Sequence, residues 1–340
     1  MATIADVARH AGVGLGTVSR VLNGSPQVRD ETRQRVLAAI AALDYRPNPL
    51  ARGLSLGRSH SLGVVVPFFT HASAVERLRG VVAALEGSRY DLVLFNVSSP
   101  DHRDEHLASL TRRDRADGLL VMTLPPPAPD LERLTRARVP VVLVDARGVG
   151  VPMVLTDDRA GGRMATQHLV DLGHERIAFI GDDPGNPFGF TAGAQREQGY
   201  EAVLAEAGIP HRSELVRHGQ HDREEARVLA AELLAEPDGP TAVFASSDVQ
   251  ATGVLAAAAA AGRRVPEDLS VIGFDDIELS AYVGLTTVRQ PLFDSGFLGA
   301  RLLLDALDSN DPPVADEHEL PLELVERSTT APPSQGRTAA

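Results

Sequence analysis

The sequence of 340 residues contains no cysteine and no lysine, and only 4% of its residues are aromatic. Without thiols the chain can form no disulfide, no thiolate metal site and no cysteine nucleophile. No apolar run approaches the roughly 18 residues that a membrane-spanning helix needs, and the first residues lack the apolar segment of a signal peptide. We therefore expect a cytoplasmic protein with no membrane partner, whose cores are filled mainly by aliphatic side chains.

The net charge of −13 argues against nucleic-acid binding by the chain as a whole, but the charge is unevenly distributed. Residues 1–60 contain eight arginines and four acidic residues, a surplus of four positive charges, so the remainder of the chain carries −17. A basic segment attached to an acidic body is typical of a protein that binds DNA through one end.

Residues 3–23 have the pattern of two short helices joined by a turn. Thr3 precedes a helical run of apolar residues, where its hydroxyl can cap free N–H groups, and Gly12 supplies the turn. The second helix is expected to turn Val18, Val21 and Leu22 inward and to expose Leu15, Gly16, Thr17, Ser19 and Arg20. This pattern predicts a helix-turn-helix, although a fragment of an ordinary helical core has the same spacing.

A third helix is expected after the turn at Gly24, capped by Asp30 and with Arg33 and Arg35 either touching phosphate or solvated. Its buried stripe is predicted to be Val36, Leu37, Ile40 and Leu43. Residues 48–57 then form either a plain linker or a short amphipathic helix. A helix this short is marginal alone in water, so it would need a partner such as DNA or its copy in a dimer.

From residue 61 onward, apolar runs alternate with helical stretches. The predicted strands are residues 62–67, 91–96, 117–122, 139–145, 176–181, 214–219, 241–246 and 269–275, with helices between them and a last helix over 294–307. Repeated βα units predict parallel sheets covered on both faces. We expect two doubly wound lobes that bind a ligand in the cleft at the carboxyl ends of their strands, with a last strand over 319–325 returning to the first sheet.

Several motifs occur together in one order: TIADVARHAGV, TVSRVLNG, TRQRVLAAIAALDYRPN, ARGL, GGRMATQHLVDLGHERIAFIG, REQGYEAVL, VPEDLSVIGFDD, LTTVRQP and ERST. With them the chain resembles the LacI family of bacterial transcription regulators over roughly residues 2–330. The resemblance implies an all-α helix-turn-helix headpiece (1–47), a hinge helix and linker (48–60), and an α/β effector and dimerisation domain like that of periplasmic binding proteins (61–330). The first lobe would comprise about 61–160 and 291–326 and the second about 161–290, with a disordered tail over 331–340.

The resemblance also implies a homodimer that places two second helices in successive major grooves of a palindromic operator. Arg20 would read guanine or contact phosphate, and Leu54 of the hinge helix would wedge into a central base step. The glycines at 14 and 16 depart from the family pattern, which leaves few polar groups to read bases. The DNA-contacting residues implied are Thr3, Leu15, Gly16, Thr17, Ser19, Arg20, Asn23, Asn48, Ala51, Arg52 and Leu54.

The effector implied is a sugar or related polyol, because carboxylates, a guanidinium and amides can bond to its hydroxyl groups. The residues implied to contact it are Phe69, Ser73, Asp145, Phe190, Arg196, Ser247, Asp248, Asp275 and Gln290. Some of these have a structural alternative: Asp248 could cap the helix that follows, Arg196 could pair with a carboxylate of the cleft, and the phenylalanines could be core residues.

Other constellations favour a binding protein over an enzyme. His102 and His106 stand four residues apart but have no evident third metal ligand, so no metal and no cofactor are expected. Asp145 with Asp275 could suggest the paired carboxylates of a glycosidase. The alternative to a repressor is therefore a solute-binding or sugar-hydrolysing protein with an incidental helical extension, and the basic N-terminal segment argues against it.

Overall fold

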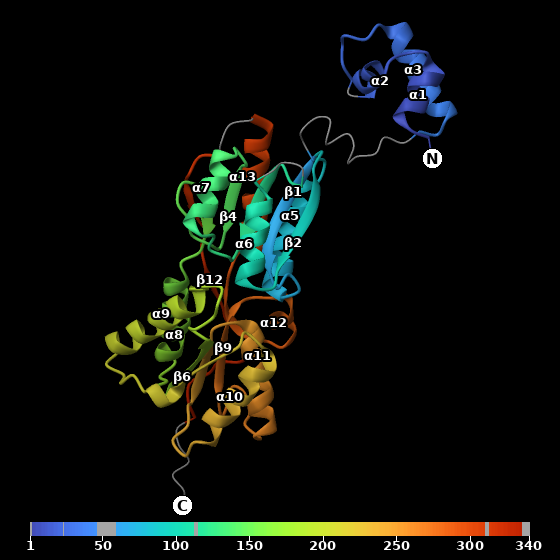
Figure 1. Ribbon diagram of the computed structural model, residues 1–340. Helices are drawn as coiled ribbons and strands as arrows, with labels where there is room; N and C mark the ends of the chain where they lie inside the picture. Colours follow the sequence, from blue (N-terminus) through green and yellow to red (C-terminus); the bar gives the residue numbers. More distant parts are fainter. Residues whose placement is uncertain (1, 23, 46–58, 112–114, 310–312, 335–340) are drawn as a thin grey trace, which may run out of the picture. The chain divides into compact units, whose positions relative to one another are not determined.

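The computed structural model describes residues 2–22, 24–45, 59–111, 115–309 and 313–334 (Figure 1). The chain divides into two compact units, Met1–Ser59 and His60–Ala340. The predicted hinge helix over 48–56 lies outside the described residues.

The first unit, here called the headpiece, contains α1 (Ile4–Ala11), α2 (Leu15–Leu22) and α3 (Asp30–Ala42). Thr3 and Asp6 form a reciprocal capping box at the start of α1, and Gly12 ends the helix in the left-handed conformation with a φ of 64°. The helices enclose a small core that includes Val7, Val18 and Val36. The predicted pair of short helices joined at Gly12 is confirmed.

Two details of α3 differ from the prediction. Arg29, rather than Asp30, occupies the N-cap position, and no side chain caps the helix there. Leu37 is 45% exposed, whereas Ala39 is buried beside Val36. Val36, Ile40 and Leu43 pack in the headpiece core as predicted, and Ala39, a small residue, takes the buried position that was assigned to Leu37.

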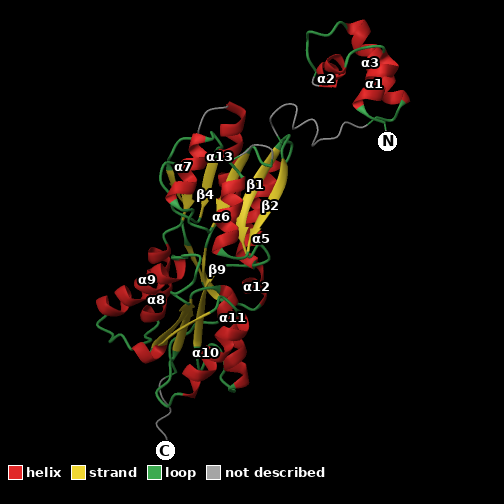
Figure 2. Ribbon diagram, viewed as in Figure 1, coloured by secondary structure: helices red, strands yellow, loops and turns green. Residues whose placement is uncertain are grey.

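The first lobe is built on a parallel sheet with the strand order β11-β5-β4-β3-β1-β2 (Figure 2). Its strands are β1 (Ser61–Pro67), β2 (Asp91–Val97), β3 (Gly118–Met122), β4 (Val141–Val144), β5 (Met153–Leu155) and β11 (Glu317–Glu319). Helices α5 (Ala72–Leu85) and α13 (Leu292–Ser309) cover one face, and α6 (Pro100–Ser109) and α7 (Ala128–Arg136) cover the other. Both faces of the sheet are therefore buried, as the runs of valine and leucine predicted.

The second lobe repeats this plan with the strand order β12-β10-β9-β8-β6-β7. Its strands are β6 (Ile177–Asp182), β7 (Val216–Gly219), β8 (Ala242–Ala245), β9 (Ser270–Asp275), β10 (Thr286–Arg289) and β12 (Glu323–Val325). Helices α8 (Asp158–Asp171) and α9 (Ala192–Glu206) cover one face, α10 (Arg223–Ala235) and α11 (Asp248–Ala260) cover the other, and the short α12 (Glu278–Tyr282) precedes β10. The predicted fold, two doubly wound lobes behind a helical headpiece, is confirmed.

The C-terminal part of the chain corrects two predictions. The strand expected over 319–325 is two short strands: β11 pairs with β5 in the first sheet, and β12 pairs antiparallel with β10 in the second. The tail expected from residue 331 is tied to the second lobe at its start, because the Ala331 N–H donates to Ser270 and its carbonyl accepts from His174. Thr329 is buried beside them, so these polar residues are ordered by hydrogen bonds.

The described helices include none with the length and apolar character needed to cross a membrane.

Each lobe contains a helix pair in which a glycine permits close backbone contact. A Cβ atom on Gly296 of α13 would lie 1.9 Å from the carbonyl oxygen of Arg77 on α5, and one on Gly162 of α8 would lie 2.1 Å from that of Arg196 on α9. Real atoms cannot approach so closely, so a side chain at either position would push the two helices apart.

We predict that Gly296→Ala lowers the free energy of unfolding by about 2–3 kcal/mol, because α13 must move away from α5 to make room for the methyl group. Urea unfolding of the full chain measures the effect. Arg301→Ala, at an exposed position on the same helix, is the matched control and should cost about 0.5 kcal/mol or less. Equal stability of the two variants would show that the helices can separate freely.

Candidate functional site

Several loops that follow parallel strands hold non-glycine residues in the left-handed region. Phe68 follows β1, Thr123 follows β3, Asp145 follows β4, and Asp275 and Asp276 lie at the end of β9, with φ values of 46°, 58°, 54°, 118° and 57°. Such conformations cost about 1–3 kcal/mol each and persist where the surroundings enforce them. The carboxyl ends of strands are also where open α/β sheets bind ligands, so this strain marks the edge at which a site is expected.

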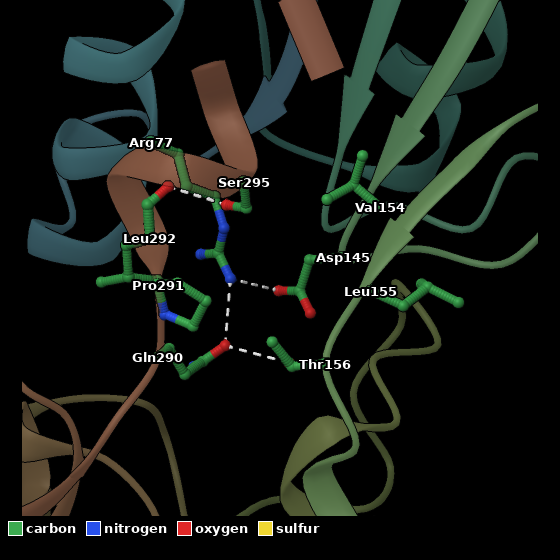
Figure 3. Close-up of a pocket in the computed structure, with 9 residues that line it drawn as sticks. All are labelled: Arg77, Asp145, Val154, Leu155, Thr156, Gln290, Pro291, Leu292 and Ser295. Carbon is green, nitrogen blue, oxygen red and sulfur yellow. Dashed lines mark hydrogen bonds and ion pairs between the residues drawn. The ribbon is translucent and has the colours of Figure 1, made fainter. Parts of the chain in front are cut away.

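A hydrogen-bond network joins the two lobes at these strand ends (Figure 3). The Nη2 atom of Arg77, on α5, donates to Oδ2 of Asp145 at 2.8 Å and to Oε1 of Gln290 at 3.4 Å. Gln290 follows β10, and its Nε2 donates to Oδ1 of Asp275 at 2.6 Å. Thr156 donates to the same Gln290 oxygen at 3.3 Å. One amide thus connects a cation of the first lobe with a carboxylate of the second.

Arg196, on α9, anchors the second lobe's half of the network. Its Nε donates to Oδ1 of Asp158 at 2.8 Å and its Nη1 to the Ser246 carbonyl at 2.5 Å, while Nη1 lies 4.0 Å from Oδ1 of Asp275. Its guanidinium carbon lies 3.7 Å from the centre of the Phe274 ring, a cation–π contact in a buried setting. The observed partners of this side chain are protein groups, so the structure shows the pairing with a carboxylate, which was one of the two sequence alternatives.

Burial dominates the electrostatics of these groups. It raises the pKa of Asp145 and of Asp275 despite the nearby cations Arg77 and Arg196. Burial alone would lower the pKa of Arg196, but the charges of Asp158 and Asp275 raise it above its ordinary value. Keeping these carboxyl groups ionised in the interior therefore costs free energy, and the neighbouring cations offset part of that cost.

Asp248 and Ser247 do not face this network with free polar atoms. Both are fully buried, and the carboxylate of Asp248 accepts hydrogen bonds from Ser280, Thr287 and the Ile277 N–H. Burial and the charge of Asp275 raise the pKa of Asp248 to about 7. The Ser247 hydroxyl caps α11 by accepting from the Gln250 N–H. Asp248 therefore holds the loop after β9, and Ser247, not Asp248, is the side-chain cap.

The two phenylalanines predicted to contact the effector, Phe69 and Phe190, lie beside a group of packed rings between the lobes. Phe69 is 38% exposed, whereas its neighbour Phe68 packs edge-on against Phe188 of the second lobe, with ring centres 5.4 Å apart. Phe190 is partly buried and stacks on Phe188 at 5.2 Å. Ser73 is partly exposed in the first turn of α5.

A pair of histidines forms a further contact between the lobes. His71, at the N-cap of α5, stacks on His221 of the second lobe with ring centres 5.7 Å apart and planes at 16°. Nδ1 of His221 lies 3.0 Å from Oδ1 of Asp182, and Phe68 stacks on the other side of His71. An open groove of about 730 Å³ lies beside them, lined by residues of both lobes that include both histidines and the exposed Tyr282.

The sequence reasoning missed Arg77, Asp158, His71 and His221. For Arg77 a signal existed: the buried side of α5 runs through Ala74, Arg77 and Gly80, so helical spacing places this arginine in an otherwise small and apolar stripe. The histidines carry no comparable signal, because they are brought together from opposite lobes. In the described part of the chain, no three histidine or acidic side chains are grouped closely enough to hold a metal ion.

The headpiece exposes most of the predicted DNA-contacting residues that the structure describes. On α2, Gly16 and Arg20 are exposed and Leu15 is 53% exposed, while Thr17 and Ser19 are partly exposed. Thr3 is exposed, but its hydroxyl already bonds to Asp6. The remaining predicted contacts lie outside the described residues: Asn23, Asn48, Ala51, Arg52 and Leu54.

One arginine of α3 has an internal partner. Nη2 of Arg33 donates to the Ser25 carbonyl at 2.7 Å, so it fixes the loop between α2 and α3, whereas Arg35 is exposed. Most of the predicted DNA-contacting residues that the structure describes therefore lie on the exposed side of α2.

The pKa values of His71 and His221 are shifted in opposite directions. Burial and the charge of His221 lower the pKa of His71, although Asp222 and Asp182 oppose this. Burial would lower the pKa of His221 as well, but its hydrogen bond to Asp182 and the charges of Asp182 and Asp275 raise it, against the opposing charge of Arg196. The stacked pair therefore favours one imidazolium beside one neutral imidazole.

These shifts predict a pH optimum for the stability of this contact. Because the folded protein lowers the pKa of His71, protonating this residue destabilises the fold as the pH falls below 6.5, the ordinary pKa of histidine. Because the folded protein raises the pKa of His221, the stability that this residue contributes is full below pH 6.5 and is lost as the pH rises through the raised pKa. In thermal unfolding from about pH 5 to 8, the stability lost in His71→Gln should shrink toward acid pH. The loss in His221→Gln should shrink toward alkaline pH.

Phe190→Leu is the control for this experiment, since its ring stacks on Phe188 and exchanges no proton. Its effect should be the same at every pH. Parallel pH profiles for all three variants would show that the two imidazoles do not titrate as the geometry requires.

Comparison with known proteins identifies the two units. Residues 3–48 match the family described as bacterial regulatory proteins, lacI family, and residues 166–330 match a periplasmic binding protein-like domain. The ribose operon repressor of Halalkalibacterium halodurans is 33% identical over 333 residues, which cover 97% of each chain.

Solved structures agree with this assignment. The complex of the transcriptional regulator CelR with cellobiose is 34% identical, with a TM-score of 0.69, and covers 97% of this chain and 100% of its own. The lac repressor dimer bound to operator and the anti-inducer ONPF is 27% identical, with a TM-score of 0.79, and covers 97% of this chain and 99% of its own. The chain therefore belongs to the LacI family of bacterial transcription regulators.

Proposed function

We propose that this chain is a homodimeric transcriptional repressor that binds a palindromic operator through α2 and is controlled by a sugar or related polyol in the cleft between its lobes. The observation that carries the proposal is the network Asp145–Arg77–Gln290–Asp275, which joins both lobes at the carboxyl ends of their strands. A ligand that changes how the lobes are joined can alter DNA binding by a helix-turn-helix on the same chain.

The chemistry of the cleft supports a polyol. Asp145 and Asp275 can accept hydrogen bonds from hydroxyl groups, and Arg77, Arg196 and Gln290 can donate to hydroxyl oxygens. Related regulators carry sugars in their names: one relative is a ribose operon repressor, and one structure is a complex with cellobiose. Asp145 and Asp275 each have a protein partner in this network, an arrangement that favours binding over the hydrolysis considered as an alternative.

Exposed apolar side chains on the first lobe support the homodimer. Val75 and Val82 of α5 are 43% and 52% exposed, and Phe293 and Phe297 of α13, the helix packed beside it, stack on each other while remaining more than a third exposed. Apolar surface of this kind is typical of a protein–protein interface. The lac repressor, whose structure resembles this chain, is described as a dimer on its operator.

The proposal is tested by fluorescence anisotropy of the full chain with DNA from its own promoter, titrated with a panel of sugars. We expect tight binding at low salt that weakens as salt rises, and a change in DNA affinity with at least one sugar. Deletion of residues 1–59 should abolish DNA binding and leave sugar binding intact. If that deletion leaves the affinity for DNA unchanged, the repressor assignment fails.

For the recognition helix, we predict that Arg20→Ala weakens operator binding about 5- to 150-fold, the range expected for losing one bidentate contact to guanine. The loss should be confined to operators that keep the guanine at one position. An equal loss on every DNA sequence, with a shallower salt dependence, would instead assign Arg20 to phosphate contact. Arg163→Ala, which breaks an exposed pair with Glu206 in the effector unit, is the matched control and should leave the affinity for DNA unchanged.

A further inference from the structure

Arg77 is an unusual residue for the position it occupies. It lies in the buried stripe of α5 and is only 3% exposed, and its guanidinium points toward Asp145 and Gln290 (Figure 3). Nη2 makes both of its hydrogen bonds. Its Nε, in contrast, is buried without an acceptor, and it is the one buried side-chain nitrogen in this condition among the residues that the structure describes.

An unpaired N–H on a buried charged group is costly, at about 1–3 kcal/mol or more. Such groups are rare in folded proteins and call for an explanation. A cavity of about 10 Å³ adjoins Arg77 and is also lined by Asp145, Thr156 and Gln290. This is close to the smallest space that holds one water molecule, and a single hydroxyl group is of similar size. A hydroxyl can accept a hydrogen bond from an arginine and at the same time donate one to a carboxylate.

The charges around the cleft limit which ligands can supply that hydroxyl. Three described cations at the cleft each have a carboxylate partner: Arg77 has Asp145 at 2.8 Å, Arg196 has Asp158 at 2.7 Å, and His221 has Asp182 at 3.0 Å. Asp275 is left 4.0 Å from Nη1 of Arg196, which donates to the Ser246 carbonyl, and it accepts a hydrogen bond from the neutral amide of Gln290. With every carboxyl group ionised, the four carboxylates of Asp145, Asp158, Asp182 and Asp275 therefore face only these three cations.

A buried surplus of negative charge opposes a second anion. A phosphate or carboxylate placed among these groups would lose its water and face Asp275 with no cation free to balance it. An ammonium group would suit the charge but cannot accept a hydrogen bond from Arg77. A neutral hydroxyl satisfies both conditions.

We propose that Arg77, together with Asp145, binds one hydroxyl group of an uncharged polyol, and that Asp275 excludes phosphorylated and acidic sugars from the same cleft. This rests on the proposed function, because it concerns the ligand of the same site, and it names the residue and the class of sugar that the family resemblance does not.

The class of ligand is tested by isothermal titration calorimetry of the full chain. The probes are D-ribose, cellobiose and D-glucose, each neutral, with ribose 5-phosphate, glucose 6-phosphate and glucuronate as anionic counterparts. We expect at least one neutral sugar to bind and its anionic counterpart to bind at least about tenfold more weakly, since like charges brought together cost several kcal/mol. A phosphate or acid that binds as tightly as the neutral sugar would overturn the assignment.

The role of Arg77 is tested with Arg77→Lys and Arg77→Met. Lysine keeps the charge beside Asp145 but has no Nε–H at that position, so the variant should fold. We expect it to lose about tenfold or more in affinity for the neutral sugar, the loss of one hydrogen bond to a charged group. Arg77→Met leaves Asp145 buried without its cation, so it should lose stability as well. Unchanged sugar affinity in Arg77→Lys would overturn the contact.

A monodeoxy series of the bound sugar separates contact from packing. Removing the hydroxyl that Arg77 binds should weaken binding to the wild-type chain but not to Arg77→Lys, whereas every other deoxy sugar should lose equally in both proteins. A purely structural role would give equal losses for every deoxy sugar and would overturn the proposal. If no probe binds the wild-type chain while operator binding is retained, the polyol of the proposed function fails, and this inference fails with it.

Discussion

The positions of the charged groups in the cleft depend on the close contact of helix backbones at two glycines. At Gly296 and Gly162 a neighbouring helix passes so close to the carbonyl of Arg77 or Arg196 that no side chain fits between them. Each arginine is thus carried on a helix pressed against its partner, and its guanidinium reaches the strand ends instead of solvent. Because protein interiors resist small changes in volume, this packing fixes where the two cations lie. The carboxylates then follow from the sheets, since Asp145 and Asp275 end parallel strands.

This arrangement contributes little to the stability of the fold. Burying an ion pair such as Arg196–Asp158 often contributes no more than well-packed apolar side chains would, and the strained backbone at Asp145 and Asp275 adds a further cost. Such costs are common where geometry serves binding. The same reasoning separates Asp248 from the other carboxylates, because its hydrogen bonds go to Ile277, to Ser280 of α12 and to Thr287 of β10, all in its own lobe. Asp248 builds the site without being part of its ligand-facing surface.

Local pattern was sufficient to predict the headpiece and most of both sheets, because helical spacing and apolar runs are properties of neighbouring residues. It was insufficient for the short elements β5, β10 and α12, whose three to five residues carry little periodicity. Strand β12 and the ordered Ala331 depend on pairing with distant residues, which no local pattern encodes. In the cleft, the resemblance pointed to Asp145, Arg196, Asp275 and Gln290, which the structure places in one network. The histidine pair carries no local signal because its members come from opposite lobes, whereas Arg77 was passed over although helical spacing places it in the buried stripe of α5.

Gln290 differs from the other network residues in its place along the chain. It lies where the chain crosses from β10 in the second lobe to α13 in the first, and Thr156, its hydrogen-bond partner, lies where the chain crosses from β5 to α8. A ligand shifts a conformational equilibrium only by the difference between its affinities for the two states. Bonds made by a residue at a crossing change when the lobes move, whereas the Arg77–Asp145 pair stays within one lobe. In the function proposed above, Gln290 is therefore the residue that would couple ligand binding to lobe movement, and Arg77 and Asp145 would contribute affinity from one side of the cleft.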